Sequence, residues 1–140
     1  MKSIKKVRWV LITLAVAIIL SKAIQAGMYN HQNNVDLMKG IVDSINSQLP
    51  MNVDSSTRCE KVTLEEKVLI YHMTIINYNE FENEKTELAQ NLDNMIKSNA
   101  CRDPNYLKFM NMGISIQINY KTSDNILITS ITLPSTFCDQ

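Results

Sequence analysis

The chain has 140 residues, with 14 basic side chains, 14 acidic ones and a formal net charge of zero. This length is enough for one domain. Five of the basic residues precede Asp36, the first acid, so nine basic residues face 14 acidic ones in the rest of the chain. Because an acidic domain lacks the positive surface that nucleic acids require, we expect no nucleic acid partner.

The N-terminal segment has the pattern of an export signal. Four basic side chains lie within residues 2–8, a mostly apolar run covers residues 9–20, and small residues follow. This order predicts a secretory signal peptide over residues 1–26. A retained signal anchor is the alternative, although a membrane-spanning helix needs about 20 apolar residues and Lys22 interrupts the run. Membrane contact is expected only if residues 9–28 are retained.

A flexible lead over residues 27–33 is expected to connect this signal to a single α+β domain over residues 34–140. The domain begins with apolar residues at helical spacing, which predicts a first helix with a cap at Asn33 or Asn34 and an end at Pro50. The residues of this stripe are Val35, Met38, Ile41, Val42, Ile45 and Leu49.

Residues 51–78 have the pattern of β-strands. Strands are predicted from about Thr57 to Leu64 and from Val68 to Tyr78, joined by a charged turn. The second of these is apolar on both faces, which is typical of a central strand with helices on at least one side.

Two further helices follow. A stripe that begins at Phe81 predicts a helix that stops near Asn99. Asp103 followed by Pro104 is a typical start of a short helix, and Gly113 can adopt the left-handed conformation that closes it.

The clearest pattern in the chain is a hairpin from Ile114 to Leu133. Ile116, Ile118 and Tyr120 alternate with polar residues, and a β-branched strand follows the polar turn over residues 121–125. The whole order therefore predicts an α+β fold: an about four-stranded antiparallel sheet in αββ-αββ order, with helices packed on one face. A single long helix cradled in a curved sheet is the alternative.

Three cysteines are present, and cysteines outside the cytoplasm tend to pair. We predict a disulfide between Cys101 and Cys138, because it would tie the end of the helical region to the tail beyond the last strand. Cys59 would then be a small buried side chain on a strand, with intermolecular pairing and thiol reactivity as alternatives.

Catalytic and cofactor signatures are missing from the sequence. No nucleophile elbow, phosphate-binding loop, zinc-protease motif or dinucleotide glycine pattern occurs, and we predict no metal or cofactor. The enzyme hypothesis depends on a thiol reaction at Cys59 with His72 as its base, which requires both side chains within hydrogen-bond reach. We expect a protein that is not an enzyme.

One polar segment, residues 49–58, is a candidate recognition site. Asp54, Thr57 and Arg58 surround two serines, so side-chain to backbone hydrogen bonds or an Asp–Arg pair would give this loop a defined shape. A purely structural corner between helix and sheet is the alternative.

Together with the export signal, the motif LP-x-x-VD-x-x-TR over residues 49–58 and the C-terminal cysteine pair give the chain a resemblance to a family. It resembles small exported bacterial proteins of uncharacterised function, over about residues 45–138. The other positions that carry the resemblance are Tyr71, Thr74, Gly113 and Tyr120. The resemblance implies a periplasmic domain with one disulfide and implies no activity.

These observations predict a periplasmic or secreted envelope protein that binds a protein or another envelope component, in an accessory, inhibitory or immunity-like role. The second hypothesis is an inner-membrane-anchored component of a secretion, conjugation or lysis-control assembly, with its domain in the periplasm. The third is a small thiol enzyme that uses Cys59.

Overall fold

The computed structural model describes residues 34–76, 78 and 82–139. The predicted signal segment, the lead and Phe81 lie outside these residues. In chain order, the elements are α2 (Asn34–Asn46), β1 (Met51–Asn52), β2 (Thr57–Glu65), β3 (Val68–Ile75), α3 (Glu82–Ala100), α4 (Pro104–Asn111), β4 (Ser115–Thr122) and β5 (Leu127–Leu133). Among the described residues, none of the helices is both long and apolar enough to cross a membrane.

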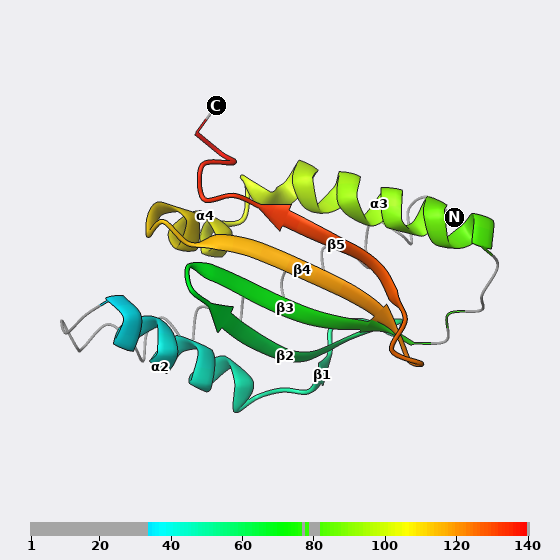
Figure 1. Cartoon of the computed structure of the whole chain (residues 1–140), viewed down its shortest axis with the longest axis horizontal. Coiled ribbons are helices and arrows are strands. Elements are labelled where there is room, and N and C mark those ends of the chain that lie inside the picture. The colour runs from blue at the N-terminus through cyan, green and yellow to red at the C-terminus, as the bar shows by residue number, and fades with distance from the viewer. Residues whose placement is uncertain (1–33, 77, 79–81, 140) are drawn as a thin grey trace.

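The strands form one sheet in the order β1-β2-β3-β4-β5 (Figure 1). β2–β3 and β4–β5 are antiparallel hairpins, whereas β3 and β4 run parallel. The predicted α+β class is confirmed, but the predicted four-stranded antiparallel sheet is wrong in two respects. β1 adds a fifth strand, and the middle pair is parallel because α3 and α4 return the chain to the end of the sheet where β3 begins.

Most predicted element boundaries agree with the structure. The carboxylate of Asp103 accepts the Asn105 N–H at 2.9 Å and caps α4, and Gly113 has a φ of 77° after that helix. The prediction that the second strand reaches Tyr78 is wrong. The strand ends at Ile75, and the pairing with the chain before β2 extends one residue further, since Ile76 donates its N–H to the Ser56 carbonyl at 2.7 Å.

The hydrophobic core lies on one face of the sheet. Alternate side chains of β3 and β4, such as Leu69 and Ile116, belong to the same buried cluster as side chains from all three helices, such as Met38, Leu92 and Phe109. α2 packs against β2, α3 lies along β5, and α4 contacts β4 (Figure 1). The helices therefore cover one side, the covered face, and leave the other side, the open face, to the alternating side chains.

Asn46, the last residue of α2, binds the outer edge of β2. Its side-chain nitrogen donates to the Val62 carbonyl at 2.7 Å, and its side-chain oxygen accepts the Val62 N–H at 2.8 Å. One amide thus makes the pair of hydrogen bonds that a neighbouring strand would make. β1 is too short to reach Val62, since it pairs only with Arg58 and Cys59.

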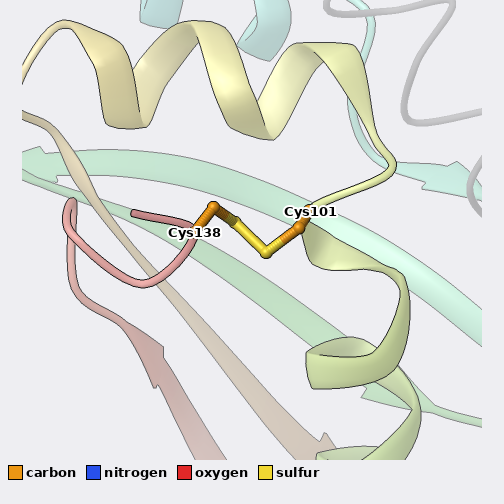
Figure 2. The surroundings of a disulfide bond; sticks show 2 residues. All are labelled: Cys101 and Cys138. Atoms are coloured by element: carbon orange, nitrogen blue, oxygen red, sulfur yellow. A yellow bond between two sulfur atoms is a disulfide. The ribbon is translucent and has the colours of Figure 1, made fainter. Parts of the chain in front are cut away.

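The predicted disulfide between Cys101 and Cys138 is present in the structure. Cys101, in the turn between α3 and α4, is bonded to Cys138 in the tail after β5, with 5.5 Å between the Cα atoms (Figure 2). The bond joins the crossover between the two hairpins to the end of the last strand. Cys59 is a free, buried cysteine on the covered face, as the simplest reading of its strand position predicts.

We predict that the double variant C101S/C138S loses about 3–4 kcal/mol of unfolding free energy, because the disulfide spans 37 positions of sequence and restricts the unfolded chain. Urea unfolding of the oxidised protein followed by circular dichroism would measure the change. Treatment with a reductant should destabilise the wild type by the same amount and leave the double variant unchanged. A loss below about 1 kcal/mol would contradict the prediction.

We predict that N46A loses about 2–3 kcal/mol, because it removes two hydrogen bonds and leaves the Val62 N–H and carbonyl without their partner. N94A is the matched control, since Asn94 is an exposed residue within α3. Urea unfolding should show the control within about 0.5 kcal/mol of the wild type. Equal stability of the two variants would show that Asn46 does not stabilise the edge.

Candidate functional site

The open face is a polar surface that the helices of the described residues leave uncovered. Its side chains come from four strands and are mostly uncharged groups that form hydrogen bonds, with Arg58 and Lys121 in the row at one end and Lys61 in the next row. The polar and charged residues that alternate with the core positions are Arg58, Lys61, Thr63, His72, Thr74, Ser115, Gln117, Asn119, Lys121, Ser130 and Thr132. Such a surface can recognise the polar groups of a partner.

Asn119 is the centre of a hydrogen-bond network on this face. Its side-chain oxygen accepts the hydroxyl of Ser130 at 2.6 Å and the side-chain amide of Gln117 at 3.0 Å. Ser130 lies directly opposite Asn119 on β5, whereas Gln117 is two residues earlier on β4. The three side chains are therefore held in defined positions on the surface.

His72 lies beside this network on β3. Its Nε2 is 2.9 Å from the hydroxyl oxygen of Thr63 on the neighbouring strand. Partial burial lowers the pKa of His72 from its usual value of 6.5, and the positive charges of Lys61 and Lys121 lower it further, while Glu65 acts in the opposite direction. At neutral pH the imidazole is therefore uncharged, and it completes the hydrogen-bonding surface.

The predicted recognition residues do not form one site. Asp54 accepts the Ser56 N–H at 2.6 Å, and Thr57 is buried, with its carbonyl accepting backbone N–H groups from the start of the loop. Arg58 points to the open face and pairs with Glu60 at 2.6 Å rather than with Asp54. Of the two alternatives, the side-chain to backbone bond is present, whereas Arg58 pairs with Glu60, two residues along its own strand, and not with Asp54.

Cys59 and His72 lie on opposite faces of the sheet. Cys59 is directly opposite Met73, a core residue, so its thiol points into the covered face, whereas His72 is the next residue along β3 and points to the open face. Burial, and to a lesser extent the charge of Glu60, raises the pKa of the Cys59 thiol to about 12. The geometry therefore separates the two members of the thiol–imidazole pair on which the enzyme hypothesis depends.

The described residues contain no group of three or more His, Cys, Asp or Glu side chains that could hold a metal ion. Besides the Arg58–Glu60 ion pair, the polar contacts on the open face are among amides, hydroxyls and one imidazole. These groups bind by hydrogen bonding, and their arrangement fits recognition better than proton transfer.

Sequence reasoning did not single out Gln117, Asn119 or Ser130. The strict alternation of the hairpin did place the first two on the polar side of β4, which was the only signal they carried. Their contact with one another, and with His72 on a separate hairpin, depends on how the strands are ordered in the sheet.

No family model and no curated protein matches the sequence. Three solved structures share the fold. A Pseudomonas aeruginosa protein described as secreted aligns with a TM-score of 0.61 and 11% identity, over 74% of this chain and 90% of that chain. EpsS, the pilotin from the Vibrio vulnificus type 2 secretion system, aligns with a TM-score of 0.53 and 13% identity, over 69% of this chain and 84% of its own.

AspS, the type II secretion system pilotin from Vibrio cholerae, aligns with a TM-score of 0.51 and 15% identity, again over 69% of this chain and 84% of its own. At these identities the likeness concerns the fold alone. The helix-covered sheet of this chain is therefore an architecture that also occurs in one secreted protein and two pilotins.

We predict that the stability of the wild type falls relative to that of H72Q as the pH drops from 8 to 5. The pKa of His72 is lower in the folded chain than in the unfolded chain, so near and below about pH 6.5 the unfolded chain binds more protons. The free energy of unfolding therefore falls as the pH drops. Urea unfolding at several pH values would measure the difference in stability, which should become independent of pH by about pH 8, where the imidazole is neutral in both states. A difference that stays constant with pH, or has the opposite sign, would contradict this assignment.

Proposed function

We propose that this chain is a non-enzymatic exported envelope protein that binds a macromolecular partner as an accessory component of a secretion assembly. The observation that carries the proposal is the fold, which is shared over more than two thirds of the chain with two type II secretion pilotins and with a secreted protein. A pilotin-like accessory role is the specific form that we favour over an inhibitory or immunity-like one.

Features of the chain itself support a binding role. The open face presents hydrogen-bonding side chains in fixed positions, and the one free thiol is buried with its pKa raised. The chemistry on the described surface is thus that of a docking surface rather than of a reaction centre.

The disulfide and the export pattern support a location outside the cytoplasm. Disulfides persist in oxidising compartments such as the bacterial periplasm, and the bond between Cys101 and Cys138 joins distant parts of the fold. Together with the basic and apolar pattern over residues 1–26, this favours a periplasmic or secreted domain.

The test is deletion of the gene in the bacterium that encodes it. We expect the release of a protein exported by its type II secretion system to fall several-fold, because the assembly would lack an accessory component. The full chain should restore release, whereas a chain without residues 2–26 should not, since it would remain in the cytoplasm. Immunoblots must show equal amounts of both chains.

Normal secretion in the deletion strain would contradict the proposal. The N-terminal residue of the protein recovered from the complemented strain shows whether the signal segment is cleaved. A start near Ile24 or Gly27 in the soluble envelope fraction means a free protein, whereas an intact Met1 in the membrane fraction means an anchored one. Both results are compatible with an accessory role, but only the second requires a partner near the inner membrane.

A further inference from the structure

β5 is the last strand of the described sheet, and the direction of its main-chain groups can be derived from two hydrogen bonds. The Ser115 N–H donates to the Lys67 carbonyl at 2.8 Å, so Ser115 faces β3, whereas the Thr122 N–H donates to the Ile126 carbonyl at 2.9 Å, on the β5 side. Main-chain groups alternate in direction along a strand. The even-numbered residues of β4 therefore face β5.

The outward-facing groups of β5 follow from the pairing register. Thr129, Ile131 and Leu133 lie opposite even-numbered residues of β4, so their N–H and carbonyl groups bond to β4. Ser130 and Thr132, between them, direct their main-chain groups away from the sheet, and no backbone bond from them to another element occurs among the described residues. Both residues are exposed.

The opposite edge of the sheet is protected, and this contrast makes the β5 edge informative. On β2, Thr57 bonds to the preceding loop, Cys59 pairs with β1, and both main-chain groups of Val62 bond to the Asn46 side chain. Proteins usually protect such edges, because free N–H and carbonyl groups recruit other strands.

The sequence of β5 itself lacks the usual protective residues along most of its length. The segment Leu127–Leu133 contains no charged residue and no proline, and consists mainly of β-branched side chains. The irregularity in its pairing lies near the hairpin turn, opposite Tyr120 and Lys121, which leaves the part with Ser130 and Thr132 regular. α3 runs along β5 (Figure 1), and its buried residues Leu92 and Ile96 belong to the core cluster of the covered face, so an added strand would approach from the open side.

We infer that β5 is a docking edge, to which a partner protein adds an extended segment as a further strand. A row of alternating N–H and carbonyl groups is satisfied by another extended backbone. Because the edge is uncharged and β-branched, the segment that fits it is uncharged and β-branched as well. This inference specifies how the partner of the proposed function binds, and its physical test does not use that partner.

The test supplies such a strand at high effective concentration. The full chain is extended after Gln140 by a flexible Gly/Ser linker of about 20 residues, which spans roughly 25 Å, and by a strand of alternating Thr and Val. The probe is thus the tethered Thr/Val strand, and the control tail has the same linker with alternating Thr and Pro, which cannot form a ladder. Amide hydrogen exchange measured by NMR reads the main chain directly.

In the unextended chain we expect the amides of Ser130 and Thr132 to exchange at least about tenfold faster than that of Ile131. The Thr/Val tail should slow both by about tenfold or more, and the Thr/Pro tail should not. In the extended chain, S130A should keep the slowed exchange at Thr132, because it retains the main-chain N–H. S130P should lose it, because proline removes an outward N–H while the bonds to β4 remain.

Three results would overturn the inference. One is slow exchange of Ser130 and Thr132 in the unextended monomer, which would mean that the edge is already covered. Another is no slowing by the Thr/Val tail, and the third is a concentration-dependent dimer with both amides protected, which would mean that a second copy is the occupant. If the exchange experiment fails, the proposed role in secretion is still testable by gene deletion. If secretion is normal in the deletion strain, the exchange experiment still decides whether β5 accepts a strand.

Discussion

The parallel pairing of β3 with β4 is the contact on which the rest of the molecule depends. Eight consecutive residue pairs, from Val68 with Ser115 to Ile75 with Thr122, join two hairpins that are far apart in sequence. Each hairpin alone has one short antiparallel ladder, and two-stranded hairpins are marginally stable in water. Their side-by-side arrangement creates a sheet face wide enough to bury a core, with Leu69 and Ile116 fully buried at its centre.

The parallel pairing also decides where the helices lie. Parallel strands need a long crossover, and α3 and α4 form it, so their apolar sides must cover the sheet that they cross. The disulfide between Cys101 and Cys138 joins this crossover to the chain beyond β5. The long connection from β3 to β4 is therefore held covalently between α3 and α4. α2 covers the remaining part of the same face, and the opposite face carries mostly polar side chains, with Val68 and Ile70 as its apolar members on β3.

The two edges of the sheet differ in the neighbouring groups that can bond to their main chains. α2 ends beside β2, where Asn46 can bind Val62 and where the following residues form β1. β5 is followed by Pro134 and a tail held by the disulfide, and neither supplies a further strand to its outer side. Within the described part of the chain, the sheet is therefore closed by side-chain and strand contacts at β2, whereas the main-chain groups of Ser130 and Thr132 on β5 bond to no other element.

What the sequence by itself determined is local: the two hairpins, the helices, the Asp103 cap of α4 and the α+β class. Alternation at Ile116, Ile118 and Tyr120 reports which residues face inward, and Asp103 followed by Pro104 marks a helix start, because these signals depend on neighbours a few residues away. The cysteine pair was also predictable, because the N-terminal pattern predicts export and the order of the elements places Cys101 and Cys138 at the two ends that a bond could join.

Only the tertiary structure decided the strand order, the parallel central pair and the contacts of the open face. Asn119 meets Ser130 because the pairing register of β4 and β5 places them opposite each other. Register and strand order depend on the summed burial of many residues distant in sequence, and no local pattern encodes that sum. The face on which Cys59 points, opposite to His72, is likewise a product of that register.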